Sequence, residues 1–275
     1  ILDPDWLTKF EAWMDARGIA GGTKNSYRSA VSGMYRLALR PQWRKKTHVL
    51  ANPMAGTERD ARRSRTGTLT IDQLRAWITA APPHVKLALA VGALAPKLRL
   101  SSILNLRWGV NIPKALDFIT VYDHKTIRHT DEPQVMPIDP QLQTILGPLW
   151  KPSGYVITFR GEPVKDIKTA LRRAAKDAGI DYGRASITFH SLRHTMATLL
   201  AELGVPERQR QEVMGWLDAQ TAQGYTHLRP THERQPLALL SGAVQIADVV
   251  QGPVQETNRT TPKKPARFRV VRQRA

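Results

Sequence analysis

Apolar residues recur every three or four positions in two stretches near the start of the chain, and this spacing predicts two helices. The first helix falls within residues 3–17, and its apolar stripe consists of Trp6, Phe10, Trp13 and Met14. The second begins near Thr23 and ends before Pro41, with an apolar face made of Tyr27, Ala30, Val31, Met34 and Ala38. The other side of this helix carries Lys24, Arg28 and Arg36. These helices predict a small helical domain with one basic face, although solvation alone would also explain the three cations.

A second series of elements begins near residue 70. Thr70 to Gln73 have the form of a capping box, and Pro82 and Pro83 open a helix that Pro96 ends. Periodic apolar residues predict further helices at residues 164–178, 188–204, 206–215 and 236–250. Two strands joined by a polar turn are predicted at residues 117–123 and 133–138. The fold class predicted is therefore mainly α with a small antiparallel β-sheet.

The pattern also divides the chain into domains. Residues 1–55 form the small helical domain, and residues 56–68 are polar, basic and without periodicity, as expected of a linker. Four arginines in this linker, Arg59, Arg62, Arg63 and Arg65, favour a strap that lies along phosphates. Residues 69–230 form the second domain. Residues 231–275 add a helix and a basic tail, of which residues 252–275 are expected to be mobile.

Charge points to the kind of partner. The 275 residues include 41 Lys and Arg against 23 Asp and Glu, a formal net charge of +18, and the sequence pI is about 10.6. A globular chain this basic usually binds a polyanion, most often nucleic acid, and a basic tail on an ordinary domain is the alternative. The absence of cysteine excludes thiol chemistry. The sequence contains neither an apolar run of about 18 residues that could span a membrane nor a basic-then-apolar leader at its start. We therefore expect a soluble, cytoplasmic protein. The chain begins at Ile1 rather than Met, which is compatible with removal of an N-terminal segment.

The segment TFHSLRHTMATLLAELG, residues 188–204, is the first that suggests chemistry. It places His190, Arg193 and His194 within about one helical turn, where they would bind either a metal or an anion. Metal-binding helices of the H-E-x-x-H type carry a carboxylate inside the motif, and a guanidinium at that place would repel a divalent ion. We therefore expect an anion site and no metal. A second arginine, Arg99, opens a short helix, a place that favours phosphate.

A tyrosine completes the set. Tyr225 lies on the polar segment GWLDAQTAQGYTHL, nine positions after Trp216. With LRLSSILNLRW at residues 98–108 and HSLRHT at residues 190–195, the chain resembles the tyrosine site-specific recombinases, or phage integrase family. The resemblance runs from Leu7 to Leu228. It implies a helical core-binding (SAM-like) domain followed by a tyrosine-recombinase catalytic domain.

The resemblance also implies roles. Tyr225 would be the nucleophile, Arg99 and Arg193 the clamps on the scissile phosphate, and His190 the acid or base. Trp216 stands where most members have His, and its indole N–H can still donate to phosphate. Lys125 matches the lysine that protonates the departing 5′-hydroxyl, with Lys114 as a competitor. No cofactor is implied, because the phosphotyrosyl bond keeps the energy needed for rejoining.

Three departures from the family pattern are visible. Lys97 replaces a glycine and could add a phosphate contact, Ser102 replaces a glutamate, and 50 residues follow Tyr225. None removes a catalytic group, so we expect an active integrase that assembles as a homotetramer on double-stranded DNA, in the bacterial nucleoid or a phage-infected cell. DNA-bending or directionality proteins are further candidate partners, and the helix after Tyr225 is expected to dock on a neighbouring protomer. A catalytically silent DNA-binding regulator and a type IB topoisomerase are the alternatives.

Overall fold

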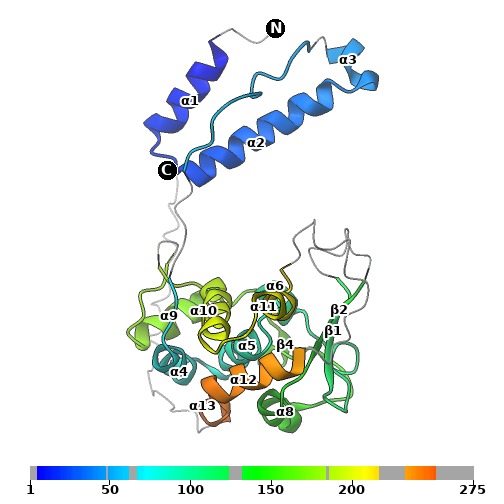
Figure 1. Cartoon of the computed structure of the whole chain (residues 1–275), viewed down its shortest axis with the longest axis vertical. Coiled ribbons are helices and arrows are strands. Elements are labelled where there is room, and N and C mark those ends of the chain that lie inside the picture. The colour runs from blue at the N-terminus through cyan, green and yellow to red at the C-terminus, as the bar shows by residue number, and fades with distance from the viewer. Residues whose placement is uncertain are drawn as a thin grey trace, which may run out of the picture. The chain divides into compact units, whose positions relative to one another are not determined.

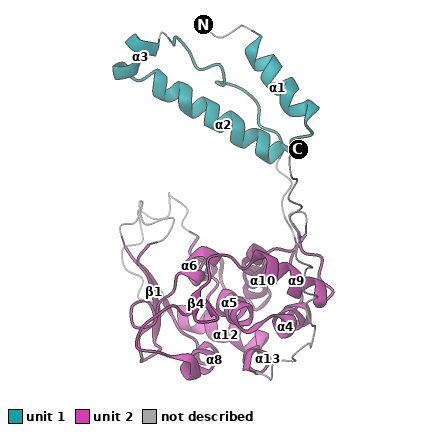
Figure 2. Cartoon of the chain, turned by 180° about the vertical axis from the view of Figure 1, so that it is seen from behind, with its two compact units in different colours: residues 1–65 teal, residues 66–275 magenta. Residues whose placement is uncertain are grey.

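A computed structural model describes residues 5–47, 49–61, 67–123, 132–183, 186–216 and 233–251. The chain divides into two compact units, residues 1–65 and residues 66–275, coloured separately in Figure 2. No helix in the described ranges has both the length and the apolar character of a membrane span. Lys125 and Tyr225 lie outside these ranges, as do Arg62, Arg63, Arg65 and the tail from residue 252.

Three helices form the first unit: α1 (Trp6–Ala16), α2 (Gly21–Ala38) and α3 (Pro41–Thr47). Helix α3 is absent from the sequence prediction, in which the preceding helix simply ends before Pro41. It occupies the first position of α3, where proline is tolerated since that amide needs no helical partner. The rings of Trp6 and Phe10 stack with centroids 5.2 Å apart, and Phe10 lies 6.2 Å from Trp13.

The burial of α2 is the reverse of its amphipathic pattern. Tyr27 and Met34, on the expected apolar face, are 41% and 70% exposed, whereas Asn25 on the polar side is buried. The amide of Asn25 explains this, because it donates to the carbonyl of Asp60 (2.8 Å) and accepts from the Asp60 amide (3.0 Å). The polar face of α2 is therefore the one that packs against the extended segment 52–60.

Most helices of the second unit surround a central one (Figure 1). Helix α5 (Pro83–Leu94) is apolar on every side and is buried from Val85 to Leu94, as expected for a core helix. Around it pack α4 (Ile71–Ala80), α6 (Leu100–Leu104), α8 (Pro140–Leu146), α10 (Phe189–Glu202), α12 (Arg234–Val244) and α13 (Ala247–Gln251). Gly92 permits a close approach of α10, since a Cβ at this position would lie 2.6 Å from Cζ of Phe189.

The remaining elements are α9 (Lys168–Asp177), α11 (Glu207–Met214), the 3₁₀ helix η1 (Gly147–Leu149) and four short strands. Strands β1 (Phe118–Val121) and β2 (Gln134–Pro137) pair antiparallel, with Val121 opposite Gln134. Strands β3 (Thr158–Phe159) and β4 (Glu162–Pro163) form a second, unpredicted hairpin. The mainly α fold is confirmed, with two small sheets where one was expected.

Two helix predictions need correction. The helix expected from residue 164 begins only at Lys168. Strand β4 ends at Pro163, and the residues between the two elements connect the strand to the helix. The helix expected at 236–250 is broken at Gln245, whose φ is 42°. Gln141 of α8 explains the break: its amide donates to the Ser241 carbonyl (2.8 Å) and accepts from the Ile246 amide (2.6 Å).

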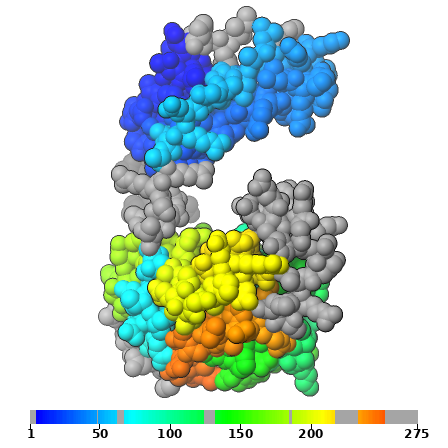
Figure 3. All heavy atoms as spheres, viewed as in Figure 1, coloured from blue at the N-terminus to red at the C-terminus, as the bar shows by residue number. Residues whose placement is uncertain are grey.

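The C-terminal helices pack on their own unit. Arg75 of α4 bridges to Asp248 of α13 (2.6 Å), and Leu237, Leu240 and Val244 of α12 are buried. Figure 3 shows α12, in orange, directly beside α11, in yellow. The apolar residues Leu237, Leu240 and Val244 of α12 thus belong to the core of this unit, and the docking of this part on a neighbouring protomer stays a prediction.

Candidate active site

Arg99 lies in the turn between α5 and α6. Its backbone is extended (φ −90°, ψ 156°) and forms the N-cap of α6, while its side chain is half-buried. Pro96 prevents the continuation of α5, and Leu98 and Ile103 anchor the turn in the core. The guanidinium is thus attached to a rigid turn, and it makes no hydrogen bond or ion pair with the described residues.

Arg193 lies on the buried side of α10 and is only 9% exposed. Its guanidinium donates to the carbonyl oxygens of Pro96 and Lys97, each at 2.9 Å, and to the carbonyl of Met214. Burial, and secondly the positive charge of Arg99, lowers the pKa of Arg193 to about 10, so that it remains cationic at neutral pH. The two predicted clamps are therefore brought together, and Arg193 ties the Arg99 turn to the end of α11.

Lys97 joins this turn to three other segments. Its ammonium forms a buried ion pair with Glu233 and donates to the carbonyl of Val135 on β2 (3.4 Å). A Cβ at Gly215 would lie 2.9 Å from Cγ of Lys97 and 3.0 Å from Nε2 of Gln134. The loop end of the β1–β2 hairpin, the end of α11 and the residue that precedes α12 therefore all meet at the Lys97 side chain. Sequence reasoning expected a phosphate contact from Lys97 and gave no role to Glu233.

Trp216 follows a helix end that glycine makes possible. Gly215 has a left-handed backbone (φ 58°, ψ 40°), its amide donates to the Glu212 carbonyl (3.0 Å), and the Trp216 amide donates to the Gln211 carbonyl (2.9 Å). This pair of bonds is the Schellman arrangement that terminates helices. The indole of Trp216 is 43% exposed. Trp216 is therefore not a core residue, although its size would suggest one. It lies two positions after Met214, whose carbonyl accepts from Arg193.

His190 occupies the first turn of α10 and is exposed, three positions before Arg193. Its ring meets that of His194 edge to face, with centroids 5.0 Å apart. The Thr188 amide donates to Oγ of Ser191 (3.0 Å), which fixes the start of the helix. No group of three or more His, Asp or Glu in the described ranges is arranged to hold a metal. The exposed imidazole of His190 and the buried guanidinium of Arg193 are three positions apart on α10.

The family model described as "Phage integrase family" matches residues 68–232. The chain belongs to this family. The matched range contains Lys97, Arg99, His190, Arg193 and Trp216, and it ends one residue before Glu233. The family prediction made from the motifs is thus confirmed. Of the ion pair between Lys97 and Glu233, only Lys97 lies within the matched range.

Two curated relatives and one solved structure illustrate the family membership. The integrase of Salmonella phage P22 is 45% identical over 67 residues, which are 24% of this chain and 16% of the relative. Tyrosine recombinase XerC of Corynebacterium glutamicum is 38% identical over 79 residues, which are 28% and 24% of the two chains. The crystal structure of a lambda integrase (75–356) dimer bound to a COC′ core site shares the fold, with a TM-score of 0.57, 19% identity and 81% of each chain covered. The chain spans less than a quarter of the length of these two curated relatives.

Two predicted catalytic residues of this integrase-family chain lie outside the described ranges. Lys125 belongs to the segment between β1 and β2, and its competitor Lys114 is exposed ahead of β1. Tyr225 belongs to the segment 217–232, which Trp216 precedes and Glu233 follows. The residues on both sides of that segment are described. Glu233 is ion-paired with Lys97, and Trp216 directly follows Gly215, which lies against the Lys97 side chain.

The predicted DNA contacts of the first unit differ in their surroundings. Lys24 is paired with Asp15, and this hydrogen bond raises the pKa of Lys24. Arg28 binds both carboxylate oxygens of Glu11 and also Asp60 (2.6 Å), so the pKa of its guanidinium is raised mainly by Glu11. Arg28 therefore links α1, α2 and the segment that contains Asp60, whereas the exposed pair of Lys24 with Asp15 adds little to stability. Arg36 is exposed and has no such partner among the described residues.

Proposed function

We propose that this chain is a site-specific DNA recombinase that cuts and rejoins double-stranded DNA through a 3′-phosphotyrosyl intermediate, and that it integrates or excises a phage or another mobile element. The convergence of Arg99 and Arg193 beside Trp216 and Lys97 carries this proposal. A pair of guanidiniums can neutralise the two non-bridging oxygens of one phosphate without a metal.

The proposed reaction is a transesterification. The phenolic oxygen of Tyr225 attacks phosphorus, the bond from phosphorus to the 5′-oxygen breaks, and the phenolic proton passes to His190 or to water. Lys125 gives a proton to the departing 5′-oxygen, and the indole of Trp216 donates to a phosphate oxygen. Because the new ester keeps the bond energy, the 5′-hydroxyl of another strand can reverse the step without ATP.

The fixed geometry of the arginines gives them different tasks. Arg193 donates hydrogen bonds to three backbone carbonyls and thereby fixes the turn that carries Arg99. It also presents a buried positive charge to the phosphate. Arg99 donates no hydrogen bond to the described residues, so its donors are available to a phosphate. A preorganised donor of this kind stabilises the developing charge in the transition state without further rearrangement.

We further propose that the protein acts as an assembly on DNA. The lambda integrase of the related structure is a dimer on its core site. Exchange between two duplexes requires four cuts, which four identical protomers would supply.

Capture of covalent adducts tests the function directly. Cells that contain the protein are lysed in SDS, the protein-bound DNA is purified and sequenced, and we expect adducts at one or a few loci. Adducts scattered over all DNA would instead indicate a topoisomerase. Stable DNA binding without any adduct would indicate a silent regulator and contradict the proposal.

Arg99→Gln is expected to slow cleavage of the captured site about a hundredfold or more, because loss of one preorganised donor costs on the order of 3 kcal/mol of barrier. Single-turnover cleavage measures this change. Stability should change by less than about 0.5 kcal/mol, since the Arg99 side chain bonds to no described residue.

Arg193→Gln is the matched comparison for Arg99→Gln. It should lose both cleavage and thermal stability, because three carbonyl oxygens lose their donor. An Arg99→Gln protein that cleaves at the normal rate would contradict the phosphate clamp.

A further inference from the structure

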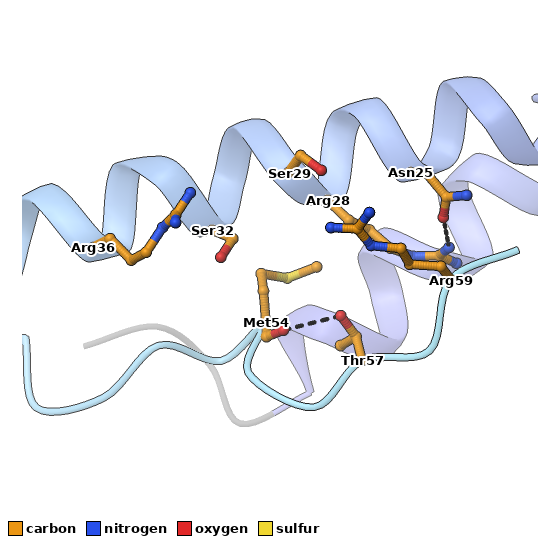
Figure 4. Close-up of a pocket in the computed structure, with 8 residues that line it drawn as sticks. All are labelled: Asn25, Arg28, Ser29, Ser32, Arg36, Met54, Thr57 and Arg59. Atoms are coloured by element: carbon orange, nitrogen blue, oxygen red, sulfur yellow. Dashed lines mark hydrogen bonds between the residues drawn. The ribbon is translucent and has the colours of Figure 1, made fainter. Parts of the chain in front are cut away.

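A polar pocket lies in the first unit between α2 and the extended segment that follows α3. Its volume is about 190 Å³, and it is lined by Asn25, Arg28, Ser29, Ser32, Arg36, Met54, Thr57 and Arg59. Figure 4 shows Arg36 toward one end and Arg28 with Arg59 toward the other. Since about 10–15 Å³ of such volume is enough to admit one water molecule, this pocket has room for a phosphate group.

The lining carries three arginines and no carboxylate. Arg28 is not available to a ligand, because Glu11 and Asp60 neutralise its charge and occupy its donors. Arg36 and Arg59 are exposed and make no hydrogen bond or ion pair with residues that the structure describes. The pocket therefore presents two uncompensated guanidiniums on a scaffold that a third arginine holds rigid.

Hydroxyl groups complete the set of donors. Oγ of Ser32 accepts a hydrogen bond from the Asn52 amide (2.9 Å), which leaves its own O–H to donate. Ser29 is exposed on the same face of α2, three positions before Ser32. Thr57 donates to the Met54 carbonyl (3.0 Å) and closes the turn that positions Arg59. Arginine with hydroxyl donors is the combination that proteins use for phosphate.

We propose that this pocket binds a phosphate of the DNA backbone, with Arg36 and Arg59 as the cationic contacts and Ser29 and Ser32 as hydrogen-bond donors. The assignment of DNA as the source of the phosphate rests on the proposed function. Phosphate contacts fix the position of a protein on the duplex without reading sequence, so the pocket would set how the first unit lies on DNA.

The salt dependence of DNA binding tests the pocket. The full chain carrying Tyr225→Phe, which is expected to bind DNA without cutting it, is titrated with a fluorescent duplex at several salt concentrations. Each neutralised phosphate contributes about 0.9 to the slope of log K against log salt, so loss of this phosphate in Arg36→Gln with Arg59→Gln should reduce the slope by about one. The weakening should be the same for all duplex sequences.

Three comparisons make the result decisive. Arg36→Lys with Arg59→Lys keeps the charges and should retain the slope. Arg17→Gln removes one charge from the same unit, at a guanidinium stacked 4.5 Å from the Trp13 ring, and should leave the slope unchanged. Thermal unfolding with and without inorganic phosphate, in the absence of DNA, shows whether the double Gln variant still folds and whether the pocket holds free anion.

An unchanged slope in the folded double Gln variant would overturn the proposal. Stabilisation by inorganic phosphate together with an unchanged slope would assign the pocket to a free anion and also overturn the DNA assignment. Failure of the parent chain to bind any duplex would instead contradict the proposed function. The pocket and the function can therefore fail separately.

Discussion

Replacement of Tyr225 by phenylalanine is expected to abolish covalent capture of DNA and to leave DNA binding unchanged. Phenylalanine keeps the ring but lacks the oxygen that would bond to phosphorus, so the adduct cannot form. Affinity comes mainly from phosphate contacts by Lys and Arg, none of which this change removes. Cleavage should therefore fall to background while the binding constant stays within about twofold at fixed salt.

The measurement uses a duplex that contains a locus recovered by adduct sequencing. Purified protein and DNA are mixed, denatured in SDS, and separated to count covalent complexes, while anisotropy reports binding. Tyr122→Phe is the matched control, because Tyr122 is exposed at the end of β1 in the same unit. Adduct formation by Tyr225→Phe, or its loss in Tyr122→Phe alone, would show that Tyr225 is not the nucleophile.

Breaking the ion pair between Lys97 and Glu233 is expected to destabilise the second unit by about 3–5 kcal/mol, because removal of one partner leaves a buried charge uncompensated. Lys97 is 9% exposed and Glu233 is 8% exposed. Burial raises the pKa of Glu233, and the charge of Lys97 opposes that shift. Oε2 of Glu233 has no hydrogen-bond partner among the described residues, so the pair is incompletely satisfied.

Chemical unfolding of Glu233→Gln and Lys97→Met measures the effect. The double variant Lys97→Met with Glu233→Leu should recover most of the lost stability, since apolar residues of similar size can replace a buried pair. Lys168→Met is the control, because its ion pair with Asp166 (3.1 Å) is exposed and should not affect stability measurably. Single variants as stable as the parent would show that the pair is not a structural link.

The two effects can be separated in one set of proteins. The Lys97–Glu233 variants should lose cleavage in proportion to their loss of folded protein, whereas Tyr225→Phe should remain fully folded and inactive. A stable Lys97→Met protein that no longer cleaves would assign Lys97 a direct contact with phosphate, which was the expectation from its position in the motif.

Local features of the chain were predictable from sequence. The capping box at the start of α4 is present, with the Thr70 hydroxyl accepting from the Gln73 amide (3.1 Å). The stripe that marks α10 is buried at Leu192, Met196 and Leu200. The family, too, followed from short motifs, because residues that contact one phosphate must keep their type and spacing. Such signals lie within a few residues of each other and need no knowledge of the rest of the fold.

Other features depended on partners far away in the sequence. Amphipathicity predicted a basic exposed face for α2, but Asp60 satisfies Asn25 and Arg28 and turns that face inward. Gln141 breaks the last predicted helix at a position 104 residues later, and Glu233 neutralises Lys97 from 136 residues away. A side chain alone does not reveal whether a carboxylate or a phosphate will meet it.

The sequence by itself therefore determined the family, the helical class and the types of residue offered to a phosphate. Only the tertiary structure decided which of these cations are paired: Arg36, Arg59 and Arg99 have no hydrogen-bond or ion-pair partner among the described residues, whereas carboxylates bind Lys24, Arg28 and Lys97. The physical reason is that charge follows from composition, whereas the neutralisation of a charge depends on which groups the folded chain brings within hydrogen-bonding distance.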